Sequence, residues 1–187
     1  MRIIAGEWRG RKLIAPKGIT TRPTTDRTRE TLFNILNSRL GSLQDLRVAD
    51  LFAGSGALGL EALSRGAKYC LFVDQEKHAV ETIRKNASSL GACERIKVQH
   101  GSVLSLGPTD QCFDLIFLDP PYKTGAANVA LSRMVRLGWI GNETLISVET
   151  SIDETIDVDG LSVEKIRDIA KTKIHLLSSK RQSLRKD

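Results

Sequence analysis

Short apolar runs alternate with amphipathic segments from residue 46 to residue 150, and this alternation restricts the fold more than any other feature of the sequence. We predict strands over residues 46–52, 68–74, 95–101, 112–119 and 143–150, and helices over residues 57–66, 76–91 and 125–140. Residues 161–178 are predicted as two further strands paired across a bend. Strands that alternate with helices of this length are typical of an open, mostly parallel sheet with helices on both faces. The sequence therefore predicts a doubly wound α/β fold.

A glycine-rich loop, in the sequence DLFAGSGALGLE, follows the first predicted strand and opens a helix. Gly54, Gly56 and Gly59 have the spacing of dinucleotide-binding loops, in which glycines form a tight turn between strand and helix. Asp74 ends the next strand, where a carboxylate that binds ribose hydroxyls is expected. These features favour a nucleotide-type cofactor over a turn with no ligand. On these residues alone, a nicotinamide-dependent oxidoreductase remains an alternative.

Asp50 ends the first strand and favours a different cofactor. A carboxylate is unfavourable beside a pyrophosphate, whereas it suits a ligand that carries an ammonium and a sulfonium group. S-Adenosyl-L-methionine carries both, and the free N–H groups of the loop would then face its carboxylate or its sugar. Asp74 would hold the two ribose hydroxyls. We therefore hypothesise that S-adenosyl-L-methionine is the cofactor.

The fourth strand ends in the sequence LDPPY, and the prolines cannot continue a strand. Ligands of doubly wound sheets bind beyond the carboxyl ends of the strands, so Asp119 is expected beside the cofactor. Its carboxylate and the Pro120 carbonyl could accept hydrogen bonds from an aromatic amine, aiming the lone pair at a sulfonium methyl group. Pro121 would stiffen the loop, and Tyr122 would stack on the base. The structural alternative is that Asp119 caps a turn, the prolines stop the strand and Tyr122 packs on the core.

Positive charge is concentrated at the N-terminus. Residues 1–40 hold nine Lys or Arg against three Asp or Glu, which equals the net charge of +6 of the whole chain. Residues 2–14 are predicted as a short hairpin or extended arm, followed by a loop and a helix that Asp26 caps and Gly41 ends. Such a block of charge favours a polyanionic partner over ordinary solvated surface charge. We expect residues 1–24 to form a basic arm and residues 25–187 the main domain.

Cysteines and apolar runs exclude several classes of protein. Cys70, Cys93 and Cys112 form no C-x-x-C pattern and have no histidine pattern beside them, so neither a zinc site nor a disulfide framework is predicted. Cys70 and Cys112 are predicted as small core residues. No apolar run is long enough to cross a bilayer, and no signal peptide is recognisable. We expect a cytoplasmic protein without metal or membrane partner.

The glycine loop, Asp74 and the DPPY sequence together resemble class I S-adenosylmethionine-dependent methyltransferases that modify amino groups. Two N-terminal blocks, RIIAGEWRGRKL and RPTTDRTRETLFNIL, are similar to bacterial enzymes that methylate guanine N2 in small-subunit (16S) ribosomal RNA, the RsmD type. The resemblance runs from Arg2 to about Glu149. It implies a seven-stranded Rossmann-like sheet with the last strand antiparallel. It also implies a monomer that acts on 16S ribosomal RNA in an assembling small subunit.

The resemblance also implies roles for individual residues. The expected catalytic residues are Asp119, Pro120, Pro121 and Tyr122. The expected cofactor-binding residues are Asp50, Ala53, Gly54, Gly56, Asp74, Gln75, Ser102 and Val103. The expected RNA-binding residues are Arg9, Arg11, Lys12, Arg22 and Arg27. Such enzymes commonly place an aspartate where this chain has Ser102, so either Ser102 or the Val103 backbone would contact the adenine.

Other functions remain open at this point. A DNA adenine-N6 or a protein glutamine methyltransferase could use the same DPPY sequence, although the chain has no large segment for reading DNA sequence. A nicotinamide-dependent oxidoreductase would leave DPPY unexplained. An RNA-binding module with an inactive cofactor pocket is the non-enzymatic alternative.

Overall fold

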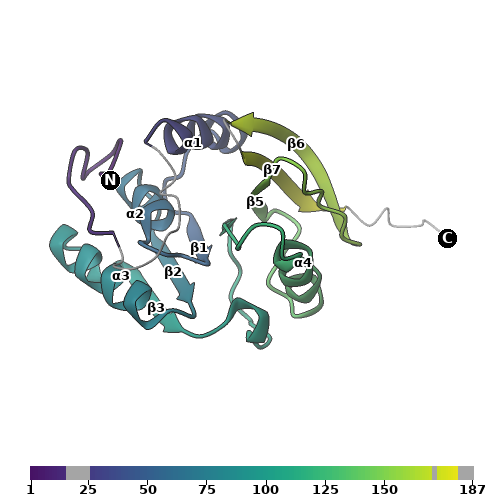
Figure 1. The fold of residues 1–187 in the computed structure, drawn as a ribbon. Coiled ribbons are helices and arrows are strands. Elements are labelled where there is room, and N and C mark those ends of the chain that lie inside the picture. The colour runs from purple at the N-terminus through teal and green to yellow at the C-terminus, as the bar shows by residue number, and fades with distance from the viewer. Residues whose placement is uncertain (16–25, 170–171, 181–187) are drawn as a thin grey trace.

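The computed structural model describes residues 1–15, 26–169 and 172–180 (Figure 1). The helices are α1 (Asp26–Leu40), α2 (Ala57–Ser64), α3 (Lys77–Leu90) and α4 (Ala126–Arg136). The strands are β1 (Arg47–Leu51), β2 (Tyr69–Asp74), β3 (Ile96–His100), β4 (Leu115–Leu118), β5 (Leu145–Ser151), β6 (Leu161–Ile169) and β7 (Thr172–Ser179). Two short 3₁₀ helices, Cys93–Arg95 and Val103–Ser105, flank β3.

The strands form one seven-stranded sheet in the order β3-β2-β1-β4-β5-β7-β6. The pairs from β3 to β5 are parallel, and β7 lies antiparallel between β5 and β6. The strand order reverses between β1 and β4, which is where doubly wound sheets bind their ligands. The predicted fold class, including the antiparallel last strand, is confirmed.

Helices cover both faces of the sheet because successive side chains of each strand point to opposite sides. Phe72 and Phe117 belong to the apolar cluster under α1, α2 and α3, whereas their neighbours Val73 and Leu118 belong to the cluster under α4. Asp50 lies on the side of α2, to whose backbone it is hydrogen-bonded. By the same alternation, Asp74 and Asp119, two residues after Phe72 and Phe117, lie on the α1–α3 side of the sheet.

The N-terminal residues 1–15 form a hairpin-like turn that packs on the main domain. Arg2 and Lys12 pair in an antiparallel bridge, and Ile3, Trp8 and Leu13 are buried. Figure 1 shows this segment beside α2 and α3, on the side of the molecule away from β6 and β7. The boundary that we predicted at residue 24 lies outside the described residues and stays a prediction.

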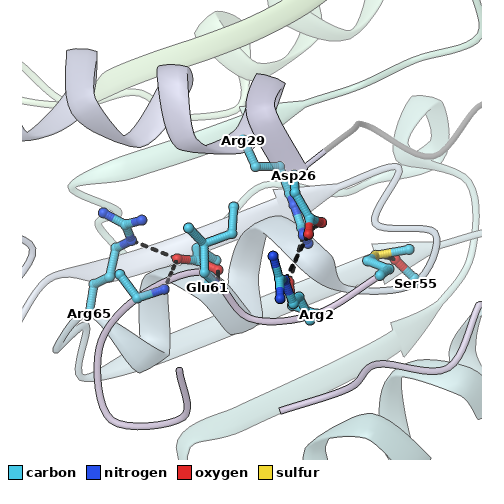
Figure 2. Close-up of polar contacts among 9 residues, drawn as sticks. Arg2, Asp26, Arg29, Ser55, Glu61 and Arg65 are labelled. Carbon is cyan, nitrogen blue, oxygen red and sulfur yellow. Dashed lines mark hydrogen bonds and ion pairs between the residues drawn. The ribbon is translucent and has the colours of Figure 1, made fainter. Parts of the chain in front are cut away.

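Polar contacts attach this segment to α1 and α2 (Figure 2). The fully buried Glu61 carboxylate on α2 accepts hydrogen bonds from the backbone N–H groups of Ile4 and Ala5, at 2.7 and 3.0 Å, and pairs with Arg65. Arg29 of α1, also fully buried, donates to the carbonyl of Arg2 at 2.6 Å and pairs with Asp26. The N-terminal segment is thereby part of the folded core.

Two details of the sequence prediction need correction. Cys112 is exposed, whereas Cys70 is buried as predicted. The fourth strand begins at Leu115, because Phe113 stacks on the Trp139 ring and the Asp114 carboxylate accepts the Arg47 N–H at the strand's edge. Within the described residues, none of the helices has the length and apolar character needed to cross a membrane.

Candidate active site

Four acidic side chains gather where β1, β2, β4 and β5 end. Asp50 pairs in register with Phe72 of β2 and Phe117 of β4. Asp74 follows Phe72 by two residues, and Asp119 follows Phe117 by two. All strands concerned are parallel, so their carboxyl ends meet at one edge of the sheet. Glu149 joins this group from β5, because Val148 pairs with Leu118 and the next residues on both strands are Glu149 and Asp119.

The loop after β1 has the backbone that its glycines allow. Gly54 and Gly56 have φ angles of +56° and +77°, in the left-handed region that favours glycine. At Gly59 the requirement is space, because an added Cβ would lie 2.4 Å from the Phe72 ring and 2.6 Å from the Cys70 sulfur. The glycines therefore form a turn with exposed backbone and seat α2 directly on β2.

Asp50 is buried beneath this loop, with 2% of its surface exposed. Its carboxylate accepts the Gly59 N–H at 2.9 Å, at the N-terminal turn of α2. Burial raises the pKa of Asp50 to about 8, and the nearby Asp74 charge adds to this increase while the Gly59 hydrogen bond opposes it. A buried carboxylate with so high a pKa is stabilised in its charged form by a nearby cation.

Asp74 is held by backbone N–H groups on both of its oxygens. One oxygen accepts the Gly54 N–H at 2.7 Å and the other accepts the Glu76 N–H at 2.8 Å. A carboxylate has about four acceptor positions, so each oxygen can still accept one hydroxyl. The contact with Gly54 fixes Asp74 against the glycine loop, as expected for a ribose-binding residue.

The loop after β4 is stiff at its start and open at its end. Pro120 is buried, Asp119 is half-buried, and Tyr122 leaves 38% of its surface exposed. Burial raises the pKa of Asp119 well above its usual range, and the charges of Glu149 and Asp50 raise it further. The Tyr122 hydroxyl donates to the Glu149 carboxylate at 2.9 Å. Stacking of Tyr122 on a base stays a prediction.

The remaining predicted cofactor residues lie along the same edge. Ala53 is buried and donates its N–H to the Val73 carbonyl at 3.1 Å. Gln75 is exposed, directly after Asp74. Ser102 is half-buried, and its hydroxyl oxygen accepts the Leu104 N–H, which leaves its own hydrogen to donate. The assignment of the adenine contact to Ser102 or Val103 stays a prediction.

The predicted RNA-binding residues lie on the N-terminal segment and α1. Arg9, Lys12 and Arg27 are exposed. Arg11 is exposed too, although its guanidinium donates to the carbonyl of Ser89 on α3. Arg22 lies outside the described residues. Their role in RNA binding stays a prediction.

Two residues at the site were not predicted from the sequence. Glu149 lies in β5, two residues before its end, and only the register between β4 and β5 places it beside Asp119. Asn86 of α3 is fully buried, and its side chain bonds both the N–H and the carbonyl of Ile14 and also the carbonyl of Ser55 in the glycine loop. No pattern in the sequence marks Asn86, because its three contacts come from distant segments.

A hollow of about 340 Å³ adjoins the loop after β4 on its other side. It lies between the start of α4 and residues 150–156, and none of the predicted cofactor residues lines it. Within the described ranges, no group of three or more His, Cys, Asp or Glu side chains could hold a metal ion.

Comparisons with known proteins identify the family and relatives of this chain. Residues 1–178 match the family described as conserved hypothetical protein 95. The chain is 39% identical over 153 residues to the ribosomal RNA small subunit methyltransferase D of Escherichia coli (strain K12), covering 82% of this chain and 76% of the relative. The protein of the same name from Haemophilus influenzae is 41% identical over 160 residues, covering 83% and 81%.

Structural similarity extends over nearly the whole chain. The solved structure of yhhF from Escherichia coli superposes with a TM-score of 0.83 at 35% sequence identity, and the match covers 97% of this chain and 99% of that one. The resemblance drawn from the glycine loop, the DPPY sequence and the N-terminal blocks is therefore confirmed. The chain belongs to the family described as conserved hypothetical protein 95, together with the ribosomal RNA small subunit methyltransferases D.

Proposed function

We propose that this protein transfers a methyl group from S-adenosyl-L-methionine to the exocyclic N2 amine of a guanine in 16S ribosomal RNA. The observation that carries the proposal is the position of Asp119, at the end of β4 and beside the end of β1, where Asp50 and the glycine loop lie. The relatives named ribosomal RNA small subunit methyltransferase D support the choice of RNA over DNA or protein.

The side chains at this edge fit the proposed cofactor. The charges of Asp50 and Glu149 both act on Asp119, yet none of the three forms an ion pair with a Lys or Arg among the described residues. Carboxylates grouped in this way favour a ligand that brings positive charge. S-Adenosyl-L-methionine, when bound, supplies a methyl group activated by a sulfonium and also carries an ammonium. Asp74 would hold its ribose hydroxyls, and the backbone of Gly54 and Gly56 would approach it closely.

Asp119 and the Pro120 carbonyl would orient the target amine. The lone pair of an aromatic amine is delocalised into the ring, so the amine must be turned toward tetrahedral geometry before it can attack. Two acceptors held by a proline-stiffened loop can impose that geometry, and positioning of this kind contributes ~7–11 kcal/mol in favourable cases. A positive charge nearby lowers the pKa of Asp119, so a bound cofactor would favour its ionised form, in which both oxygens accept hydrogen bonds.

Exposed arginines and lysines of the N-terminal segment would bind the RNA backbone. Arg9 and Lys12 point positive charge outward from a segment whose apolar side chains are buried in the core. Phosphate contacts of this kind make affinity fall steeply as salt increases. We further propose that the enzyme acts in the cytoplasm, as a monomer, on an assembling small subunit.

Transfer of a tritium-labelled methyl group tests the proposal. The purified protein is given RNA from small ribosomal subunits of cells that lack the gene, and in parallel DNA and protein fractions. Label in the RNA, with N2-methylguanosine identified by mass spectrometry, is the expected result. Asp119→Asn should abolish transfer without preventing cofactor binding, while the exposed Asp110→Asn serves as the matched control. Label in DNA or protein, or a different modified nucleoside, would contradict the proposal.

A further inference from the structure

Glu149 lies at the carboxyl end of β5, between the loop after β4 and the acids of the candidate active site. Only 8% of its surface is exposed, and it follows Val148, the register partner of Leu118. Neighbouring parallel strands lie about 4.8 Å apart, so the next residues of the two strands, Glu149 and Asp119, are adjacent. Consistent with this, Glu149 is the strongest charged influence on the Asp119 carboxyl group.

The Tyr122 hydroxyl is hydrogen-bonded to this carboxylate. The phenol donates to Oε1 of Glu149 at 2.9 Å, across 27 residues of sequence. The ring is 38% exposed, so core packing encloses only part of it. A hydrogen bond at the far end of the ring restricts both side-chain torsions, and a bond to an ionised acceptor is stronger than one between neutral groups. Glu149 therefore contributes to the orientation of the Tyr122 ring.

The rest of the loop is fixed near its two ends and, between them, by Glu154, whose carboxylate accepts the Lys123 backbone N–H. Pro120 is buried at the start, and the Thr124 hydroxyl donates to the Pro121 carbonyl at 2.7 Å. Lys123, next to Tyr122, has a φ angle of +59°, an unfavourable conformation for a residue with a side chain. A strained backbone at this point persists only where surrounding contacts fix it. The Tyr122–Glu149 bond is a contact of that kind, from β5.

We propose that Glu149 is a positioning residue that holds the Tyr122 ring in the orientation needed to stack the target base beside Asp119. The proposal rests on the function proposed above and adds a residue from a strand to which no catalytic role had been given. Glu149 acts through Tyr122 and does not itself contact the base. A carboxylate is suited to this position because it accepts the phenol hydrogen of Tyr122.

Four variants test the proposal in the RNA methyl-transfer assay: Glu149→Ala, Glu149→Gln, Tyr122→Phe and the double variant Glu149→Ala/Tyr122→Phe. Glu149→Ala and Tyr122→Phe each delete the same hydrogen bond, so each should lower kcat by about 10- to 100-fold, the loss expected from a misplaced reacting group. The double variant should be no worse than either single variant, because the two residues act as one unit. Glu149→Gln removes the same charge but keeps an acceptor oxygen, so it should recover most of the activity.

Two further readouts separate positioning from a general structural effect. The KM for RNA should change little in all variants, since phosphate contacts dominate RNA affinity, and the Kd for S-adenosylmethionine should stay unchanged. The exposed Glu143→Ala, at the opposite end of β5, is the matched control. Losses that multiply in the double variant, or a Gln variant as impaired as the Ala variant, would overturn the role of Glu149. A wild-type protein that does not methylate RNA would instead refute the proposed function, and the role of Glu149 with it.

Discussion

The attachment of the N-terminal segment depends on one buried carboxylate, and Glu61→Gln tests how strongly. Glu61 Oε2 accepts the Ile4 N–H at 2.7 Å, and Oε1 accepts the Ala5 N–H at 3.0 Å and the Arg65 Nε–H at 2.8 Å. Glutamine has nearly the same shape but one acceptor oxygen instead of two. Its NH₂ group would replace one of these oxygens. It would then face either the Ile4 N–H or the Ala5 N–H and Arg65, so that hydrogen-bond donors would oppose one another.

The expected loss follows from these three contacts. A hydrogen bond to a charged group contributes about 1.5–3 kcal/mol, and a buried donor left without a partner costs about 1–3 kcal/mol. Glu61→Gln leaves one N–H without an acceptor and makes the remaining bonds neutral, so the attachment should weaken by about 3 kcal/mol. With a urea slope of about 2 kcal/mol/M for a chain of this size, the midpoint of unfolding should fall by about 1.5 M.

Tryptophan fluorescence can follow the segment separately from the rest of the protein. The chain has two tryptophans. Trp8 is buried on the N-terminal segment, against Arg95, whereas Trp139 stacks on Phe113 in the cluster under α4. In a Trp139→Phe background, the urea midpoint followed by Trp8 fluorescence should fall by about 1.5 M in the Glu61→Gln variant.

The matched control is Glu30→Gln, at an exposed position on α1, which should leave the curve unchanged. A Glu61→Gln midpoint that stays within about 0.25 M of the wild type, equivalent to about 0.5 kcal/mol, would refute the reasoning. It would mean that the apolar contacts of Ile3, Trp8 and Leu13 hold the segment without the carboxylate.

Three further predictions concern the site and the RNA. Because the pKa of Asp50 is raised to about 8, the folded protein holds this proton more tightly than the unfolded chain does, so its stabilising contribution is complete below about pH 4 and is lost as the pH rises to about 8. Urea titrations should therefore show that the free energy of unfolding of Asp50→Asn rises relative to that of the wild type between pH 5 and pH 9, by an amount on the order of several kcal/mol. A difference in the free energy of unfolding that does not change with pH would contradict this. Gly59→Ala forces a Cβ against Phe72 and should lower the free energy of unfolding by about 1–2 kcal/mol, after allowing for the better helix propensity of alanine, while Gly107→Ala, with open space around it, should not. Arg9→Ala should reduce the slope of log affinity for RNA against log salt by about one and leave the Kd of S-adenosylmethionine unchanged, whereas equal losses of both would show that Arg9 supports the fold.

The fold was predictable because its signals are local. Strands β1, β2, β4 and β5 are mainly apolar runs, whereas β3 alternates apolar and polar residues. The helices between them carry their apolar residues on one side, so the sheet follows from the order of elements. Gly91 ends α3 with a φ angle of +73°, as its position in the sequence suggests. The prediction extended the fourth strand too far toward its start, since Cys112 and Phe113 continue the apolar pattern although Phe113 packs on Trp139 outside the sheet.

The candidate site was predictable in part, for a geometric reason. Asp50, Asp74 and Asp119 could be grouped because parallel strands end at one edge, whatever the side chains between them. Tyr122 was predicted to stack on a base, but its partner depends on the register between β4 and β5 and on the neighbour order of seven strands. Apolar periodicity gives neither of these, so Glu149 became visible only in the structure.

The N-terminal segment proposed to bind RNA and the glycine loop proposed to bind the cofactor are joined in the structure by one side chain. The buried Asn86 side chain bonds the Ile14 backbone and the Ser55 carbonyl at once, so the end of the N-terminal segment and the glycine loop share one anchor. The segment's backbone is therefore a folding element, and we expect a change to it to affect both the glycine loop and the surface proposed to bind RNA. Only side chains that leave the core, such as Arg9, can affect RNA without affecting the cofactor loop. Residues 1–15 of the basic N-terminus thus pack against the domain that carries the glycine loop, with Arg9 and Lys12 exposed on the surface.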